Sequence, residues 1–194
     1  MERTRIVGVF GGCVLLLALA APLALKAEQS KPIEMFTCFA VSVGTGRADV
    51  IEITINRWST DAEREMLLTT LQEFGQDRAL AALEKIRPTI GYMRIPNSIG
   101  YDLYYARNHP EPDGSRKVVL ATNRQVSFRE VTDNLRSMQY QFTLIELHLD
   151  KNGKGEGKLV PAAKVSWDTK AKKIEIENYN ALPVELVNVT AKKP

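Results

Sequence analysis

Hydrophobic and polar residues alternate over most of the chain. In residues 49–58, Ile51, Ile53 and Ile55 share one side of an extended segment, and polar residues occupy the other. A period of two with one polar side predicts a strand of an antiparallel sheet that is buried on one face. Similar patterns predict further strands over residues 35–43, 89–95, 99–106, 117–122, 140–150, 157–167, 174–177 and 182–189.

The pattern changes period in residues 59–87. Thr60 and Glu63 have the spacing of a capping box, the reciprocal side-chain and backbone pairing that starts many helices. Apolar residues follow at helical spacing until Gly75, which ends the first helix. A second short helix ends before Pro88, because the residue before a proline disfavours helix. Residues 59–87 are therefore predicted to be a helical pair inserted after the second strand.

The strongest predicted strand, residues 140–150, shows a slip in its pattern. Its apolar side chains change faces along the strand, first Phe142 and Leu144, then Ile145, Leu147 and Leu149. Such a slip indicates either a β-bulge or a strand that is covered on both sides.

Together these segments predict a mainly β fold. Eight or nine strands form an antiparallel meander that closes into a barrel or folds into a sandwich, with a short helical pair, α+β by strict count. The 194 residues suffice for one domain of ordinary size that buries its own core. We assign residues 28–194 to this single domain.

The N-terminus has the parts of an export signal. Arg3 and Arg5 precede an uncharged apolar stretch over residues 6–25, and Pro22 breaks it shortly before Ala27. We predict a signal peptide over residues 1–27, cleaved after Ala27, and a secreted or periplasmic protein. The alternative is an uncleaved N-terminal membrane anchor, since 20 apolar residues can span a bilayer.

The charge balance argues against two classes of partner. The whole chain has 26 basic and 23 acidic residues, and removing residues 1–27 leaves 23 and 22, a net charge of +1. A near-neutral chain gives no reason to expect nucleic acid or, after signal cleavage, a membrane surface as the partner.

Cys38 is the one cysteine after the predicted signal, and its apolar neighbours indicate a buried core residue rather than a nucleophile.

Three segments resemble those of a group of uncharacterised secreted bacterial proteins: RWSTD (57–61), PNSIGYDL (96–103) and FTLIELHLD (142–150). The resemblance covers most of the mature chain. It implies export from a bacterial cell, and it implies no activity and no functional residues.

One strand carries the weak candidates for catalysis. Glu146, His148 and Asp150 occupy alternate positions, so all three point to the same face. An imidazole between two carboxylates can act as a general base or contribute to a metal site. Because Leu147 and Leu149 face the core, we favour the other interpretation, a solvent-facing polar row, and we predict no metal site and no cofactor.

A second set of candidates could line a ligand-binding surface on two strands that are predicted to pair. Tyrosine gives a large contact area at a small cost in entropy. The candidates are Tyr92, Arg94, Tyr101, Asp102, Tyr104 and Tyr105.

The sequence as a whole shows a good core pattern and no group of side chains that converges on a catalytic site. We therefore favour a non-enzymatic, secreted binding or interaction domain with a protein or small-molecule ligand. The alternative is a small extracytoplasmic hydrolase or metal enzyme that uses His148 with Glu146 or Asp150.

Overall fold

The computed structural model describes residues 31–41, 48–95, 100–125, 141–178 and 183–194. The predicted signal peptide, residues 1–27, lies outside the described residues. The mainly β fold with a helical pair after the second strand is confirmed. The elements are β1 (Glu34–Val41), β2 (Ala48–Ile55), α1 (Asp61–Phe74), α2 (Gln76–Leu83), β3 (Gly91–Arg94), β4 (Tyr101–Leu103), β5 (Tyr105–Pro110), β6 (Arg116–Thr122), β7 (Phe142–Leu149), β8 (Lys154–Asp168), β9 (Lys173–Asn178) and β10 (Val184–Lys192).

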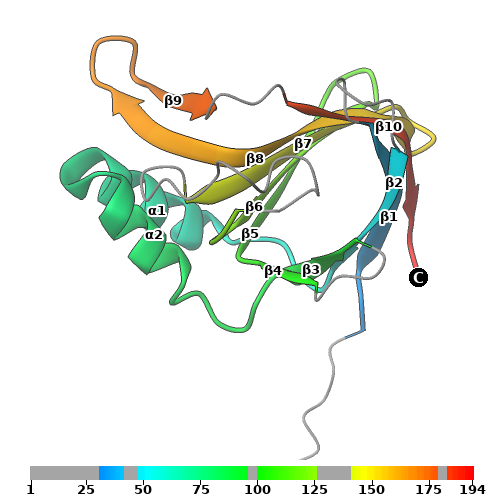
Figure 1. Ribbon diagram of the computed structural model, residues 1–194, viewed down its shortest axis with the longest axis horizontal. Coiled ribbons are helices and arrows are strands. Elements are labelled where there is room, and N and C mark those ends of the chain that lie inside the picture. Colours follow the sequence, from blue (N-terminus) through cyan, green and yellow to red (C-terminus); the bar gives the residue numbers. More distant parts are fainter. Residues whose placement is uncertain (1–30, 42–47, 96–99, 126–140, 179–182) are drawn as a thin grey trace, which may run out of the picture.

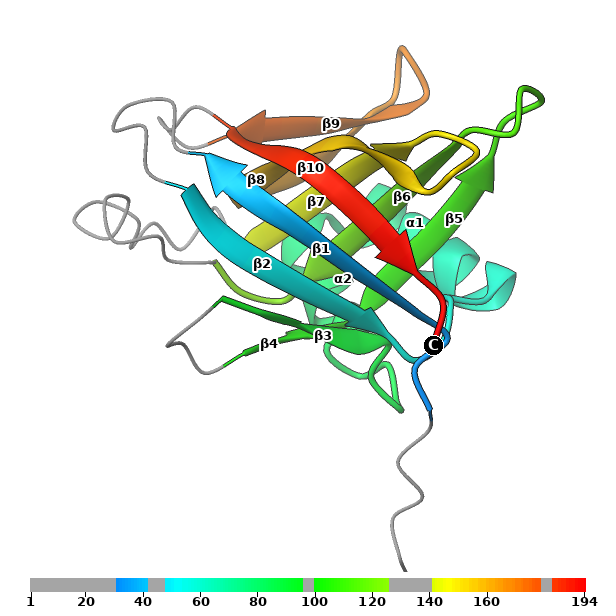
Figure 2. The same cartoon turned by 90° about the vertical axis from the view of Figure 1, so that its right-hand side faces the viewer.

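The strands form one antiparallel sheet that curls into a nearly closed barrel (Figures 1 and 2). Their order is β4-β3-β2-β1-β10-β8-β7-β6-β5, and β9 pairs with β8. The two ends of this order meet where β4 runs into β5. The Leu103 carbonyl accepts a hydrogen bond from the Ile90 amide at 2.8 Å, and the Tyr104 amide donates to the Ala121 carbonyl of β6 at 3.1 Å. Of the two predicted architectures, the chain therefore adopts the barrel.

The last strand departs from a simple meander. In a simple meander, the strand that follows β9 would pair with β9. Instead, β10 enters between β1 and β8, where Leu186 lies opposite Ala40 on one side and Gly157 on the other. This pairing joins the N-terminal strand to the C-terminal one. The local pattern of apolar residues cannot specify so distant a partner.

Buried apolar side chains fill the inside of the barrel. The three alternating isoleucines of β2, Ile51, Ile53 and Ile55, are fully buried, as predicted from their spacing. Leu147 and Leu149 of β7 are buried too. The inward residues of every long strand thus belong to one hydrophobic cluster, and this cluster supplies most of the favourable free energy of folding.

A buried ion pair connects β1 and β6 inside the barrel. Glu34 shares a face with the buried Phe36, and Arg116 shares a face with the buried Val118. The Arg116 guanidinium donates to both carboxylate oxygens of Glu34, at 2.9 and 2.5 Å, and lies 5.8 Å from the centre of the Phe36 ring. Removing Arg116 would leave the buried Glu34 carboxylate unpaired, which is strongly destabilising.

The slip that the sequence shows in β7 comes from burial on both faces of this strand, and the irregular register beside it belongs to β8. Between Phe142 and Leu144 the chain of β7 advances two residues, while the opposite positions in β8 move three, from Ala163 to Val160. The extra residue is in β8, next to Pro161, which has no amide hydrogen to give to a ladder. Phe142 is also buried on the outer face of the sheet. Of the two predicted explanations, covering on both sides therefore holds for β7, whereas the bulge lies in the neighbouring strand β8.

β10 contains a second bulge, at Asn188. Between Leu186 and Val189 this strand advances three residues while β8 advances two. Asn188 has a φ of +53°, in the left-handed region that asparagine tolerates better than most residues. The neighbouring part of β8 approaches β7 closely, since a side chain at Gly157 would collide with the Glu146 carbonyl oxygen.

The two helices form where the sequence predicts them and lie outside the barrel beside β8 (Figure 1). The capping box is present, because the Glu63 amide donates to the Thr60 hydroxyl (3.1 Å) and the Thr60 amide donates to the Glu63 carboxylate (2.8 Å). Arg57 donates to both Glu63 oxygens at 2.8 and 3.0 Å. At the start of α2, the Gln76 side-chain oxygen accepts from the Val165 amide of β8 at 2.7 Å.

The helices divide the outer face of β6–β8 into two halves. At the end of this outer face that lies near the helices, the side chains are apolar and buried, as at Ala121, Phe142 and Ala163. Further along the same face of β7, Glu146 is half-buried and His148 is exposed. We call these the covered half and the open half.

Candidate functional site

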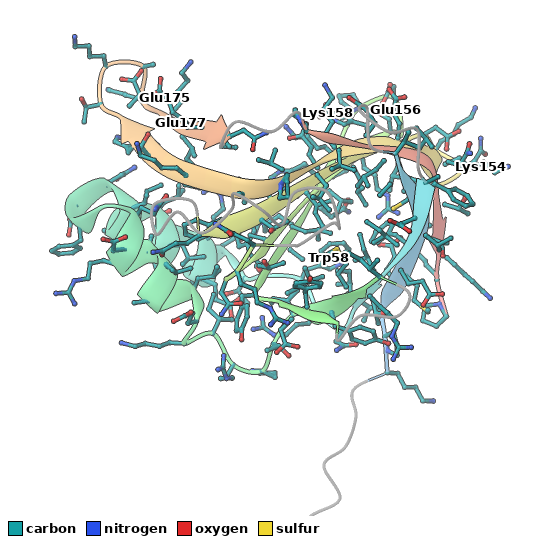
Figure 3. The ribbon with its side chains drawn as sticks, in the orientation of Figure 1. Trp58, Lys154, Glu156, Lys158, Glu175 and Glu177 are labelled. Carbon is teal, nitrogen blue, oxygen red and sulfur yellow. The ribbon has the colours of Figure 1, made fainter. Side chains whose placement is uncertain are left out.

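The open half carries a patch of charged side chains that come from four adjacent strands. Across the strands, Lys117 of β6 lies opposite His148, which lies opposite Glu156 of β8. In the next row Glu146 lies opposite Lys158 of β8, which lies opposite Glu185 of β10. Figure 3 shows Glu156 and Lys158 in succession along β8. We call this patch the charged face, and it consists of Lys117, Glu146, His148, Glu156, Lys158 and Glu185.

Within the charged face, His148 and Glu146 form the shortest contact. The His148 Nε2 and Glu146 Oε1 atoms share a hydrogen bond of 2.6 Å. The Lys117 Nζ atom lies 3.9 Å from the second Glu146 oxygen. The side chains of His148 and Glu146 are 60% and 47% exposed. The predicted outward direction of His148, with Leu147 and Leu149 facing the core, is confirmed.

The third residue of the predicted row, Asp150, has a separate role. Its Oδ1 atom accepts hydrogen bonds from the Asn152 and Lys154 amides, both at 2.8 Å. The Lys154 amide is the largest cause of a lowered pKa at Asp150. Asp150 therefore stabilises the β7–β8 turn, whereas the side-chain hydrogen bond of His148 goes to Glu146.

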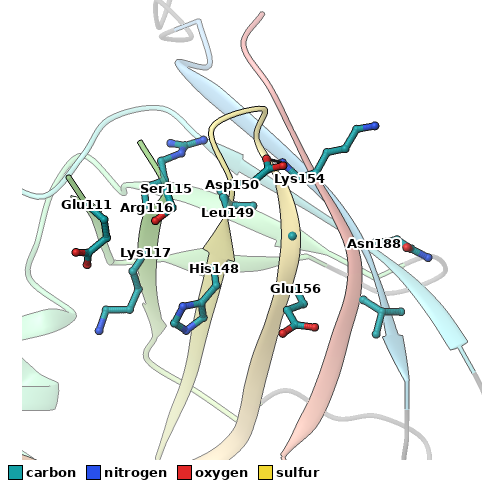
Figure 4. Close-up of a pocket in the computed structure, with 12 residues that line it drawn as sticks. Glu111, Ser115, Arg116, Lys117, His148, Leu149, Asp150, Lys154, Glu156 and Asn188 are labelled. Carbon is teal, nitrogen blue, oxygen red and sulfur yellow. Dashed lines mark hydrogen bonds between the residues drawn. The ribbon is translucent and has the colours of Figure 1, made fainter. Parts of the chain in front are cut away.

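The surface is hollowed on both sides of His148. A depression of about 670 Å³ extends from Lys117 across His148 and Glu156 to the β10 bulge at Asn188 (Figure 4). A smaller one of about 290 Å³ lies between His148 and Glu185. Both hollows include His148 and Glu156, so the charged face forms their common floor.

Four members of the charged face were not among the candidates found from the sequence. They are Lys117, Glu156, Lys158 and Glu185. Lys117, Lys158 and Glu185 lie in predicted strands, whereas Glu156 comes one residue before the predicted start of its strand at residue 157. What the sequence does not contain is the register between the strands, which places each residue opposite its neighbour.

The six tyrosine-centred candidates do not form one surface. Tyr92 and Asp102 lie opposite each other on the outside of β3 and β4, and Arg94 lies opposite Glu52 of β2. Tyr101 is opposite the buried Met93. The predicted pairing of the two strands is therefore present, but only part of the set shares a face.

The remaining members of that set are partly or fully buried. Tyr104 is buried, with the Arg87 guanidinium 5.5 Å from the centre of its ring. Tyr105 lies on β5, and burial raises the pKa of its hydroxyl. Arg124 stacks over the Tyr101 ring at 4.6 Å. Tyr104 and Tyr101 therefore form cation–π pairs with arginines of the chain itself.

Two other titratable side chains lie near or inside the barrel. His109 is opposite Lys117 at the border of the charged face, and its pKa is lowered by burial first and then by Arg107 and Lys117. Burial raises the pKa of the Cys38 thiol to about 12. A thiol that stays protonated is a poor nucleophile, which agrees with its predicted place in the core.

Across the described ranges, no group of three or more His, Cys, Asp or Glu side chains is arranged to hold a metal ion. In the same part of the chain, neither helix is long and apolar enough to span a bilayer.

Comparison with known proteins finds no matching protein-family model, no similar curated protein and no similar solved structure. Inference of function therefore starts from the geometry of the charged face.

Proposed function

We propose that this chain is a non-catalytic binding domain that works outside the cytoplasm and binds its partner on the charged face. One observation carries the proposal. Buried side chains fill the inside of the barrel, whereas both hollows described above lie on the outer surface around His148. A ligand therefore meets the open outer half of the sheet rather than an internal cavity.

The geometry of His148 favours binding over catalysis. A general base gains most from an environment that excludes water, and the His148 ring is 60% exposed. The nearest hydroxyl that lines the larger hollow belongs to Ser115, and it donates to Asp113 at 2.6 Å. Among the described residues of the hollow, the His148–Glu146 pair thus has no free hydroxyl to activate.

The charge pattern indicates the chemistry of the partner. The charge alternates along the row Glu146, Lys158, Glu185, and the row through His148 has Lys117 at one end and Glu156 at the other, so the face carries no strong field of one sign. A partner of mixed charge, such as a protein surface with lysines and glutamates in an alternating arrangement, can complement it. Exposed ion pairs of this kind set specificity and association rate, and salt weakens them.

Location outside the cytoplasm rests on the N-terminal sequence. The basic residues, the apolar stretch and Pro22 before Ala27 support a signal peptide, and the resemblance to secreted bacterial proteins supports the same assignment. Mass measurement of the mature protein tests it, with a chain starting near Glu28 as the expected result. A mature chain that retains residues 1–25 would support the anchored alternative instead.

The binding proposal is tested by capture from the protein's own extracellular medium. We compare the unchanged chain with the double variant Lys117→Ala/Glu156→Ala, which flattens the charged face on either side of His148. The matched control is Glu52→Ala/Arg94→Ala, an opposite-charge pair on the outside of β2 and β3. We expect one partner to bind the unchanged chain and the control, to be lost from the charged-face variant, and to dissociate in high salt.

Equal capture by all three proteins would contradict the assignment of the binding site. The hydrolase alternative has one observation in its favour, the 2.6 Å contact between His148 and Glu146. Turnover of a chromogenic ester or peptide that is abolished by His148→Ala would replace the binding proposal with that alternative.

A further inference from the structure

The hydrogen bond between His148 and Glu146 determines where the imidazole carries its proton. An ionised carboxylate only accepts hydrogen bonds, so the His148 Nε2 atom, 2.6 Å from Glu146 Oε1, donates the proton of this bond. A neutral imidazole has one N–H group and one lone pair, and the lone pair of His148 is therefore on Nδ1. Within the described part of the chain His148 forms no second hydrogen bond, and its side chain is 60% exposed. Neutral His148 thus offers a hydrogen-bond acceptor to a partner.

Glu156 adds a second acceptor beside the first. It lies directly opposite His148 in the β7–β8 pair, where Cβ atoms are about 4.5–5.5 Å apart. The Glu156 side chain is exposed and forms no ion pair within the described residues. Both hollows of the charged face include these two residues, and Figure 4 shows their side chains on neighbouring strands. A group that enters either hollow therefore meets two acceptors side by side.

We propose that the partner of the charged face places a basic side chain, a lysine or an arginine, over His148 and Glu156, and that mild acid releases it. The inference rests on the binding function proposed above. An ammonium or guanidinium group carries only donors, so it donates to His148 Nδ1 and pairs with the Glu156 carboxylate. An acidic side chain fits this position poorly, because it would bring a third acceptor and a second negative charge.

Acid changes the hydrogen bonding that His148 offers. A second proton on the ring turns Nδ1 from an acceptor into a donor and makes the imidazole a cation. Nδ1 then has no lone pair for the partner's N–H groups, and the two positive charges repel each other. The imidazolium also attracts the Glu156 carboxylate on the neighbouring strand, in competition with the partner. Binding is therefore strongest when the ring is neutral.

The groups that surround His148 act on its proton in both directions, since carboxylates favour the charged imidazole and lysines oppose it. They are Glu146 and Asp150 on β7, Lys117 on β6, His109 beyond it on β5, Lys154, Glu156 and Lys158 on β8, Glu185 on β10 and Glu111 at the rim of the larger hollow. The release operates in the range in which imidazoles ordinarily change charge, about pH 5–8.

Nitrogen NMR of the His148 ring tests the first step, without any partner. At pH 8 we expect the proton on Nε2 and the chemical shift of an unprotonated nitrogen at Nδ1. Glu146→Ala removes the acceptor, so it should populate both neutral forms of the ring. A proton on Nδ1 of the unchanged chain at pH 8 would overturn the proposal.

Titration with N-acetylarginine amide, followed by the NMR signals of His148 and Glu156, tests the second step. We expect saturable binding at pH 8 that is several-fold weaker at pH 5.5, and no binding of N-acetylglutamate amide. Glu156→Gln should weaken binding at both pH values. His148→Gln keeps an acceptor that acid does not protonate, so the pH dependence should disappear. The matched control is Glu52→Gln, an exposed glutamate opposite Arg94, which should behave as the unchanged chain.

The proposal is wrong if the arginine probe does not bind, binds equally at both pH values, or binds Glu156→Gln as tightly as the unchanged chain. These results are separate from the capture experiment that tests the binding function. Capture of a partner on the charged face without binding of the arginine probe would contradict only the present inference. A pH-dependent arginine site without any captured partner would contradict the binding function instead.

Discussion

The two halves of the outer face of β7 differ although they belong to one strand. Phe142 and Leu144 are buried or half-buried beside the helices, whereas Glu146 and His148, on the same face, meet solvent. Strand geometry is the same in both halves, so the difference lies in what packs against the face, and α1 and α2 pack against β8 beside the covered half. The comparison teaches that one sheet face can serve as core at one end and as an interaction surface at the other.

The largest effect is expected in the covered half, at Phe142. Phe142→Ala removes a buried ring and should lower the free energy of unfolding by about 3–5 kcal/mol. The control is Phe39→Ala on the outside of β1, where the ring is 40% exposed and the loss should stay near 1 kcal/mol. Urea unfolding measures both. Equal losses would mean that Phe142 is not covered.

Helix α1, which packs beside the covered half, should contribute the next largest effect. Leu71 is the buried side chain of α1, and Leu71→Ala should cost about 2–4 kcal/mol. Phe74→Ala, on the exposed side of the same helix, should cost much less. If thermal and urea unfolding show no loss for Leu71→Ala, the helical pair is only loosely attached and the two halves are less distinct than we infer.

A smaller effect is expected at the start of α1, where Glu63 meets Arg57. Glu63→Gln keeps an acceptor for the capping box but removes the charge, and should cost about 1 kcal/mol at neutral pH. The Arg57 hydrogen bond is the main cause of a lowered pKa at Glu63. A lowered pKa in the folded state means that the stabilisation is present above the ordinary value near 4.5 and is lost as the pH falls below it.

The direction of this pH dependence is checked by measuring the free energy of unfolding of the unchanged chain and of Glu63→Gln at pH 7 and in acid. The difference in stability between the unchanged chain and Glu63→Gln should be full at pH 7 and should shrink in acid, as Glu63 becomes protonated. A difference that grows in acid would contradict the role of the ionised Glu63 carboxylate.

The smallest effect is expected in the open half. His148→Ala should change the free energy of unfolding by no more than a few tenths of a kcal/mol, because the ring is exposed. Chemical unfolding at neutral pH measures it, beside Phe142→Ala from the covered half of the same strand. A cost of several kcal/mol would place His148 inside a structural network and would remove the contrast between the halves.

Much of this arrangement could be predicted because it depends on neighbours in the chain. The alternation of Ile51, Ile53 and Ile55 predicts their burial, and Thr60 with Glu63 predicts the first turn of α1. The outward direction of His148 follows from the leucines on either side of it. Each of these inferences needs only the period of one element.

The rest depends on contacts between distant parts of the chain. No local pattern pairs Glu34 with Arg116, which is 82 residues away. The meeting of Lys117, His148 and Glu156 requires the register of three strands, and the hollow beside them reaches Asn188 on a fourth strand. The sequence therefore predicts which side chains point outward, but it does not predict which of them become neighbours.

The insertion of β10 between β1 and β8 also determines the order in which the strands can pair during folding. As the chain is made, β1 can form a hairpin with β2 early, but its other edge has no partner until residues 184–192 exist. Barrels that depend on such distant pairings fold slowly. The chain therefore stays open until its last strand arrives, which would suit the export that we propose from the N-terminal sequence.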